Sequence, residues 1–223
     1  HGYLLGYERL NDHLSKNEGP RHRLWRIRAK QIITATGAIE RPLSFPGNDI
    51  PGIMLASAVR DYATNFGVAV GDKVAIFTNN DDAYRTAITL HEIGVTVPVI
   101  IDARSGGGGE LAHHAKELGI RVENGKAILK VFGQKRVKAV TICDYEKSGA
   151  NKEKIECDSI AMSGGWSPVV HLFSHCGGKL KWDEDLALFR PDKAAKPTSY
   201  DGLPFVTAVG SANGFLLMNE VLK

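Results

Sequence analysis

The sequence has few cysteines and no long apolar run. These two features limit the kinds of site and the kinds of protein that the chain can be. Its three cysteines, Cys143, Cys157 and Cys176, form no Cys-x-x-Cys pair, so we expect neither a redox-active disulfide nor a structural zinc site. The odd count fits a reducing compartment and predicts a cytoplasmic protein. No stretch approaches the roughly 18 apolar residues of a membrane-spanning helix. No signal peptide is visible, and we expect no membrane association.

Charge of one sign is also scarce. The formal net charge of +3 is too small to indicate a nucleic-acid partner or an anionic membrane. Arg23, Arg26 and Arg28 alternate with apolar residues, which we interpret as the solvated face of a β-ribbon. His113 and His114 are adjacent on a predicted helix, where neighbouring side chains diverge, so we expect no metal site. The 223 residues, 43% hydrophobic, are enough for one large domain or two small lobes.

The stretch from Gln31 to Pro42 organises the chain. Residues 31–36 predict a buried strand, and Gly37 lets the backbone turn sharply at its end. The string that begins there reads Ala-Thr-Gly-Ala-x-Glu-Arg-Pro-Leu-x-Phe-Pro-Gly. It resembles the crossover of flavoprotein oxidoreductases with two dinucleotide-binding domains, where the chain passes from the first nucleotide lobe to the second.

The elements after this crossover alternate between strand and helix patterns. We predict strands at 3–9, 23–36, 74–77 and 95–101, helices at 56–66 and 82–93, and a further helix beginning near 111. The alternation is a βαβ unit, which a right-handed crossover places in a parallel sheet. Residues 126–131, 137–145 and 154–162 then predict consecutive antiparallel strands, and 177–202 looks irregular.

The turn after the strand at 74–77 departs from a dinucleotide-binding fingerprint. The six positions of Gly-x-Gly-x-x-Gly/Ala read Thr-Asn-Asn-Asp-Asp-Ala over 78–83. Side chains replace the glycines that permit close approach of a pyrophosphate, and Asp81 and Asp82 add negative charge there. Either aspartate would cap the following helix, and Asp102 takes the position of a ribose-binding acid. We expect this unit to bind no dinucleotide and to act as scaffold.

The C-terminal part predicts a second nucleotide-binding edge. Residues 205–210 read as a strand ending in Gly210, and residues 215–222 read as an apolar helix. A strand, a glycine and a helix N-terminus together form an anion site. Our candidate cofactor-binding residues are Thr36 and Gly37 at the crossover and Gly210, Ser211 and Asn213 here. We predict no catalytic residue.

Three longer strings narrow the resemblance. Leu-Ala-Ser-Ala-Val-Arg at 55–60, Phe-Thr-Asn-Asn-Asp-Asp-Ala-Tyr at 77–84 and Ser-Gly-Gly-Trp-Ser-Pro-Val-Val-His-Leu at 163–172 resemble the alpha subunits of heterotetrameric sarcosine oxidases. The flavoprotein family has Gly-Asp where this chain has Gly210-Ser211, and that aspartate binds the flavin sugar. The resemblance therefore implies NAD here before FAD.

The resemblance implies a complete enzyme that oxidises sarcosine to glycine with O₂, giving hydrogen peroxide and a one-carbon unit for tetrahydrofolate. FAD and FMN would lie elsewhere in that enzyme, and the beta, gamma and delta subunits would be the partners. Because the chain begins at His1 on a strand-like stretch, we expect a piece of a longer subunit that is inactive by itself and binds NAD weakly or not at all.

The expected fold class is α/β, a Rossmann-like FAD/NAD(P)-binding fold. One complete parallel-sheet lobe with a β-meander would span 53–165, and the ends of a second lobe would be 1–52 and 166–223. Two alternatives stay open. One is a disulfide-reductase-type NAD(P)H/FAD oxidoreductase, against which the missing cysteine pair and the altered turn count. The other is a non-catalytic module for subunit assembly.

Overall fold

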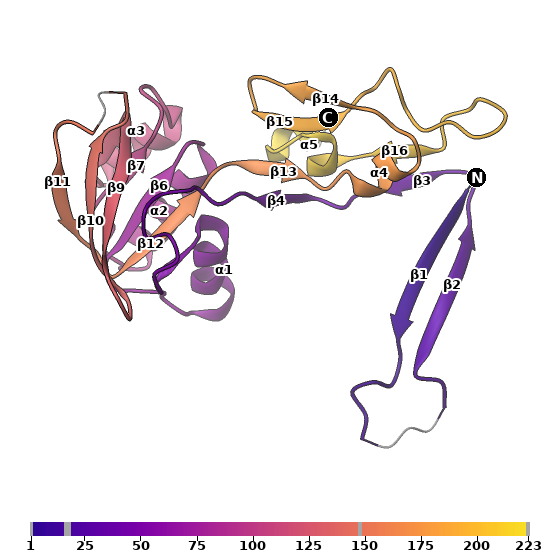
Figure 1. Ribbon diagram of the computed structural model, residues 1–223, viewed down its shortest axis with the longest axis horizontal. Coiled ribbons are helices and arrows are strands. Elements are labelled where there is room, and N and C mark those ends of the chain that lie inside the picture. The colour runs from indigo at the N-terminus through magenta and orange to yellow at the C-terminus, as the bar shows by residue number, and fades with distance from the viewer. Residues whose placement is uncertain (1, 16–18, 147–148, 222–223) are drawn as a thin grey trace. The chain divides into compact units, whose positions relative to one another are not determined.

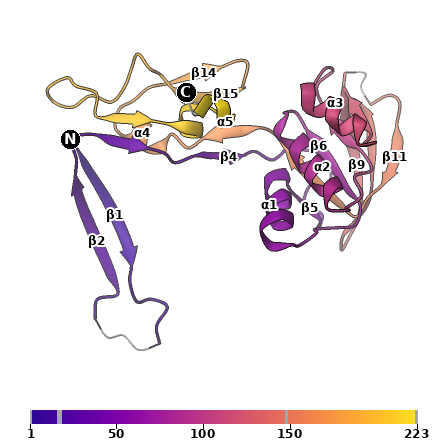
Figure 2. The same ribbon diagram turned by 180° about the vertical axis from the view of Figure 1, so that it is seen from behind.

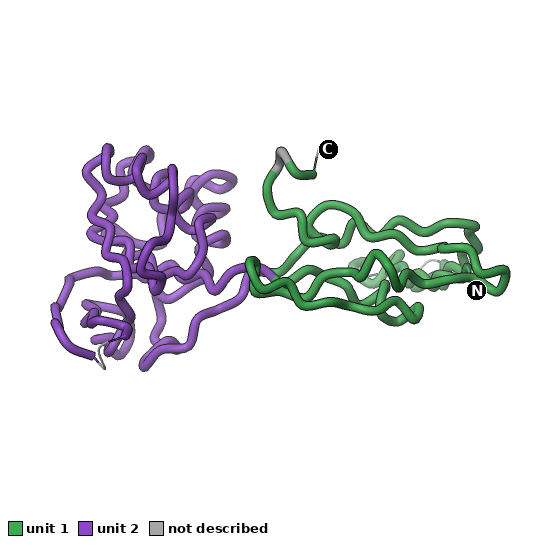
Figure 3. The backbone as a smooth tube through the Cα atoms, turned by 90° about the horizontal axis from the view of Figure 1, so that it is seen from above, with its two compact units in different colours: residues 1–39, 167–223 green, residues 40–166 purple. Residues whose placement is uncertain are grey.

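The chain forms two compact units in a computed structural model that describes residues 2–15, 19–146 and 149–221. Unit 1 contains residues 1–39 and 167–223, and unit 2 contains residues 40–166 (Figure 3). The chain leaves unit 1 in strand β4 (Ala38–Glu40) and returns in β13 (Trp166–Pro168), and these two strands pair. Within the described residues, no helix is long and apolar enough to cross a membrane.

Unit 2 is built on a five-stranded parallel sheet in the order β5-β12-β6-β7-β8 (Figure 1). The strands are β5 (Ile53–Leu55), β12 (Ser159–Ser163), β6 (Val74–Thr78), β7 (Ile100–Asp102) and β8 (Val122–Asn124). The two central strands β12 and β6 are buried along their whole length. Burial on both faces explains why they read as continuous apolar runs rather than as alternating patterns.

Three helices cover one face of this sheet (Figure 2). They are α1 (Ala56–Phe66), α2 (Asp82–Glu92) and α3 (Gly109–Glu117). Val74 and Ile76 of β6 face their apolar stripes, and Ala75 and Phe77 face the opposite side, as the period of two along a strand requires. The expected helix at 56–66 is confirmed, and Gly67 ends it in the left-handed conformation with φ 63°.

A three-stranded antiparallel meander covers the other face of the sheet. Its strands are β9 (Lys126–Gly133), β10 (Val137–Asp144) and β11 (Glu153–Glu156). The expectation that 154–162 forms one antiparallel strand is wrong, because only β11 pairs with β10 and β12 enters the parallel sheet. The chain changes sheets at Asp158, whose carboxylate accepts the backbone N–H groups of Asp72 and Lys73.

The predicted strand at 95–101 is also shorter than expected. Regular pairing is confined to β7, and residue 96 makes only an isolated bridge to Lys73. Pro98 lies between them and has no backbone N–H to donate, so it interrupts the ladder.

Unit 1 contains three two-stranded pairs of its own. They are β1 (Tyr3–Arg9) with β2 (His22–Arg28), β14 (Leu180–Asp183) with β15 (Leu188–Pro191), and the parallel pair β3 (Ile32–Thr34) with β16 (Val206–Ala208). Its helical elements are α4 (His171–His175), the 3₁₀ turn η1 (Gly210–Asn213) and α5 (Met218–Val221). A small core of Phe173, Phe205, Val206, Ala208 and Ala212 joins α4, β16 and η1.

Three predictions for unit 1 are wrong. Residues 23–36 do not form one strand, because β2 and β3 lie in different sheets, and the stretch expected to be buried contains Ile33, which is 69% exposed. Residues 177–202 are not irregular throughout, because they contain the β14–β15 hairpin, whose turn is closed by the Asp183 carboxylate accepting the N–H of Leu186. Of the apolar helix expected over 215–222, the described residues 215–221 form only α5, and residue 222 lies outside the described part of the chain. The segment directly after β16 forms a single 3₁₀ turn, an element that has little stability of its own.

Candidate dinucleotide site

The parallel pair β3–β16 gathers the five predicted cofactor residues at one edge. Val206 pairs with Ile32 and Ala208 with Thr34, and the N–H of Val209 donates to the carbonyl of Thr34 at 3.1 Å. The residues that follow both strands therefore leave from the same carboxyl edge. Thr36 and Gly37 follow β3, and Gly210, Ser211 and Asn213 follow β16. Ligands of open parallel α/β sheets bind outside such an edge.

The crossover after β3 is held by two hydrogen bonds with the backbone of Val169. Thr36 Oγ1 donates a 2.6 Å hydrogen bond to the carbonyl of Val169, whose N–H donates to the carbonyl of Gly37 at 2.9 Å. Gly37 has φ 77°, which only glycine adopts without strain. A Cβ built on Gly37 would meet no heavy atom within 4 Å. The backbone there borders open space into which a ligand can approach.

β16 is followed by the short turn η1 rather than by a long helix, and this turn carries neutral polar side chains. Within η1, the N–H of Gly214 donates to the carbonyl of Ser211 at 3.0 Å, and the N–H of Phe215 donates to that of Gly210 at 3.2 Å. Because η1 is four residues long, the macrodipole argument for an anion site does not apply to it. The Ser211 hydroxyl and the Asn213 amide are suited to the hydroxyl groups of a sugar.

The corresponding edge of unit 2 ends in a row of polar side chains. Ser163, Thr78, Asp102 and Asn124 close four neighbouring strands in register. Asn80 links this row to α2. Its Nδ2 donates to Ser163 Oγ at 2.9 Å, and its Oδ1 accepts the N–H of Asp82 at 3.1 Å.

The expectation that an aspartate caps α2 is therefore wrong. Asp81 holds the N-cap position but makes no capping hydrogen bond with its side chain. Its Oδ1 instead accepts the Arg104 Nη2 at 2.7 Å and the N–H of Gly108 at 3.0 Å. Asn80 takes over the cap because the carboxylate of Asp81 is committed to these stronger, charge-assisted contacts.

Asp102 is fully buried and is satisfied by protein groups. Tyr84 Oη donates to its Oδ2 at 2.8 Å, and Arg104 donates to both its oxygens, at 3.0 Å from Nε and 2.7 Å from Nη2. Burial, followed by the charge of Asp102, raises the pKa of Tyr84. Burial disfavours the Arg104 cation, but its hydrogen bonds to Asp102 and Asp81 outweigh this and raise its pKa. The network holds the phenol of Tyr84 neutral and Arg104 charged.

The glycine-rich loop closes over this network. A Cβ on Gly107 would collide with Asp102 and Arg104, and one on Gly108 would lie 2.6 Å from Cζ of Tyr84. Gly108 is buried and has φ 91°. The space beside the ribose-binding position of unit 2 is thus filled by the protein's own atoms, and a dinucleotide does not fit the arrangement described. At the carboxyl edge of unit 1, by contrast, a Cβ on Gly37 would meet no heavy atom within 4 Å.

No family model matches the sequence, but individual proteins do. The sarcosine oxidase alpha subunit of Corynebacterium sp. (strain U-96) is 39% identical over 199 residues, which cover 86% of this chain and 20% of that protein. The alpha subunit of Rhizobium meliloti (strain 1021) is 38% identical over 209 residues, covering 93% and 20%. The chain is homologous to one segment of the sarcosine oxidase alpha subunits. It spans about a fifth of the length of these relatives.

The fold expected from the resemblance to sarcosine oxidase alpha subunits is confirmed. The structure of T. acidophilum thioredoxin reductase superposes with a TM-score of 0.64 at 18% identity, covering 86% of this chain and 61% of that one. At this identity the likeness concerns the fold alone. The chain has a Rossmann-type FAD/NAD(P)-binding fold.

The structure gives roles to two residues, Glu40 and Arg104, that the sequence did not single out. Glu40 is only 5% exposed, and its Oε2 accepts both the N–H of Ser57 at 2.9 Å and the Ser57 hydroxyl at 2.6 Å, which caps α1. Arg104 follows Asp102 by two residues, and this short spacing could have predicted an ion pair between them. For Glu40 there was no such signal, because 17 residues separate it from its partner.

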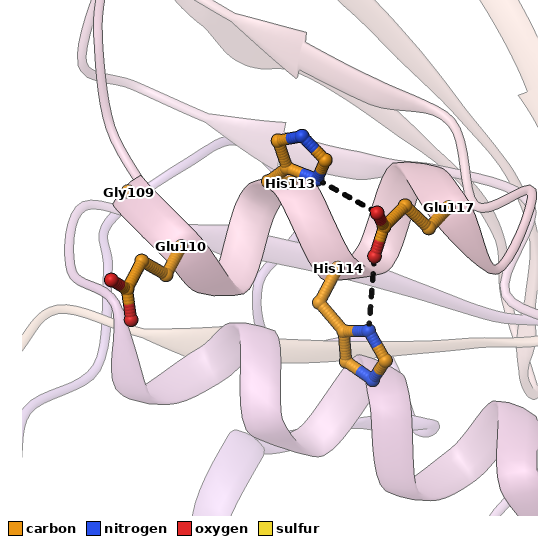
Figure 4. A pocket seen from close by; sticks show the side chains of 5 residues that line it. All are labelled: Gly109, Glu110, His113, His114 and Glu117. Carbon is orange, nitrogen blue, oxygen red and sulfur yellow. Dashed lines mark ion pairs between the residues drawn. The ribbon is translucent and has the colours of Figure 1, made fainter.

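The histidine pair lies on the exposed face of α3, where Figure 4 shows a surface hollow lined by the helix itself. His113 Nδ1 lies 3.3 Å from Glu117 Oε1, and His114 Nδ1 lies 3.5 Å from Oε2. Both rings thus turn to one carboxylate. Among the described residues, no group of three or more His, Cys, Asp or Glu side chains is arranged to hold a metal ion.

Proposed function

We propose that the chain is the dinucleotide-binding segment of a sarcosine oxidase alpha subunit and serves mainly as scaffold and as part of an NAD site. The observation that carries this proposal is the identity of 39% over 86% of the chain. The complete enzyme is an oxidoreductase acting on the CH–NH group of sarcosine. It gives glycine, hydrogen peroxide and a one-carbon unit for tetrahydrofolate.

NAD binds at the carboxyl edge of β3–β16, against Thr36, Gly37, Gly210, Ser211 and Asn213. Open space at Gly37 and the left-handed Gly210, with φ 59°, support close approach of a ligand to the backbone. Bound NAD could supply hydride chemistry, but we assign it a structural role, because the two turns offer hydroxyl and amide groups and no acid–base pair. The chain's own groups bind and orient the nucleotide. FAD and FMN belong elsewhere in the complete enzyme.

Unit 2 works as scaffold without a nucleotide. Asp81 and Asp102 share an internal ion pair with Arg104, and Asn80 caps the helix that would otherwise face a phosphate. A site whose polar groups are already paired gains little by exchanging them for ligand contacts.

The two ends of the chain form part of the first nucleotide lobe, expected as 1–52 and 166–223, and the middle, expected as 53–165, forms the second lobe. Residues 40–52 pack with unit 2. Uncovered apolar surface in unit 1 supports this division. Ile33 on β3 is 69% exposed, and Tyr3, Leu5 and Tyr7 on β1 are each at least 60% exposed. An isolated hairpin is marginal in water, so these faces suit cover by further parts of an alpha subunit. The beta, gamma and delta subunits are the partners, and the three free cysteines fit assembly in the cytoplasm.

Calorimetry with NAD on this chain and on a full-length alpha subunit tests the proposal. We expect tight binding by the full subunit, weak or no binding by the chain, and no sarcosine oxidation by the chain alone. Equally tight binding by both would contradict the division of the site. Steady NAD(P)H oxidation by the chain would favour a disulfide-reductase-type activity, against which the burial of Cys143 and Cys157 counts.

A further inference from the structure

Arg190 is a largely buried cation on β15 that reaches the segment after β16. Its Nη1 donates a 3.0 Å hydrogen bond to Asp183 Oδ2 on the paired strand β14, and the two side chains are only 17% and 19% exposed. On its other side, the guanidinium carbon lies 5.4 Å from the ring centroid of Phe215. Arg190 therefore joins the β14–β15 hairpin to the residues that follow η1.

The same guanidinium packs on the end of the 3₁₀ turn. Gly214 is buried with φ 83°, and a Cβ there would lie 3.2 Å from Arg190 Nε. Glycine thus supplies both the left-handed conformation and the room for the arginine. The N–H of Gly214 closes η1 by donating to the carbonyl of Ser211, so contact at Gly214 is contact with the last bond of the turn.

A single 3₁₀ turn bounded by two glycines has little stability of its own. One turn fixes several dihedral angles for few hydrogen bonds, and Gly210 and Gly214 are the most flexible residues that could flank it. A planar guanidinium that pairs with a carboxylate and stacks on a ring supplies a rigid external support, which lysine cannot reproduce.

We propose that Arg190 is a positioning residue for the nucleotide site, holding Ser211 and Asn213 at the carboxyl edge of β3–β16 by clamping Gly214 and Phe215. This inference rests on the proposed function of that edge. Arg190 acts through the turn, and the ligand contacts remain those of the turn and the crossover.

The test compares Arg190→Met and Arg190→Lys with Arg28→Met in the 223-residue chain. Arg28 is a matched control, because its guanidinium stacks on Tyr3 at 5.7 Å within the β1–β2 hairpin. The first measurement is amide hydrogen exchange without ligand. We expect the Gly214 and Phe215 amides to exchange about tenfold faster in Arg190→Met, with a smaller increase in Arg190→Lys. The amide of Ile76 in unit 2 should be unchanged in all three variants.

The second measurement is titration with millimolar NAD, followed by the NMR shifts of the Gly210 to Asn213 amides. Arg190→Met should weaken any wild-type response severalfold, and Arg28→Met should leave it intact. Unchanged exchange at Gly214 and Phe215 would overturn the clamp. Faster exchange with unaltered NAD binding would overturn its role in positioning the site. If the wild-type chain shows no NAD response, the same titration of Arg190→Met in a full-length alpha subunit measures the positioning role, and unaltered NAD binding there would overturn it. Absence of NAD binding by the full-length wild-type subunit would count against the proposed function and leave the clamp upheld.

Discussion

The phenolic hydroxyl of Tyr84 donates a 2.8 Å hydrogen bond to the carboxylate of Asp102, and both side chains are fully buried. Asp102 is the residue that would meet a ribose hydroxyl in a dinucleotide-binding unit. Here its oxygens are taken by Tyr84 and by the guanidinium of Arg104. This position of unit 2 is occupied by an internal ion-pair network, whose contribution to stability can be measured.

Arg104→Met should destabilise the chain by about 3 kcal/mol, because it leaves the buried Asp102 carboxylate without its cation. Urea unfolding measures the change. Arg85→Met is the control, since Arg85 pairs with Asp82 at 3.7 Å on the surface and should cost less than about 1 kcal/mol. Adding Asp102→Asn to Arg104→Met should recover part of the loss. Equal effects of the two arginine variants would contradict the network.

Asn80→Ala should cost about 1–2 kcal/mol, because it removes the cap of α2 and the link to Ser163. Asn48→Ala is the matched control, since the exposed Asn48 makes one long contact of 3.4 Å to the Leu43 carbonyl. Thermal unfolding compares the two. A loss of stability at residue 48 as large as that at residue 80 would argue against a capping role.

Glu40→Ala should lower stability by about 1–2 kcal/mol by removing the acceptor at the start of α1. Its partner variant, Ser57→Ala, removes the hydroxyl donor but keeps the backbone N–H. Because the two residues share one interaction, the sum of the two single losses of stability should exceed the loss in the double variant. Simple additivity in the double-mutant cycle would mean that the two side chains act independently.

Asp183 should make the stability of the folded chain depend on pH. The hydrogen bond from Arg190, followed by that from the Leu186 N–H, holds the pKa of Asp183 below its usual value. A lowered folded-state pKa adds stability that is complete above the unfolded value of about 4 and is lost as pH falls through the folded value. The gap in Tm between wild type and Asp183→Asn should therefore be constant from about pH 7 to 5 and shrink below about pH 4. Asp185→Asn, at an exposed position, should show no such trend.

The cysteines should differ sharply in reactivity. Burial, with a smaller effect from Asp158, raises the pKa of Cys157 to about 12, and Cys143 is buried, whereas Cys176 is exposed. Iodoacetamide at pH 8 should modify Cys176 first in the native chain, and all three cysteines in denaturant. Peptide mass spectrometry gives the site of modification. Early labelling of Cys157 would contradict the buried position.

Much of the fold followed from local pattern. Apolar residues at helical spacing located α1, and glycine placed its end at residue 67. The aberrant turn over 78–83 was visible from the missing glycines alone. The β14–β15 hairpin was missed because its aromatic residues Trp182 and Phe189 contact each other at 5.0 Å and stay exposed, so neither strand carries a clear buried alternation.

The sequence by itself determined the α/β class, the crossover at Thr36 and Gly37, and the loss of the regular glycine turn, because each depends on residue type and short spacing. The tertiary structure alone decided that Arg104 pairs with Asp81, that Glu40 caps α1, and that Arg190 reaches Gly214. These pairs join residues brought together only when strands pair and helices pack. A charged or polar side chain pairs with a group that lies near it in the folded chain, and the spacing of residues along the sequence does not determine that distance.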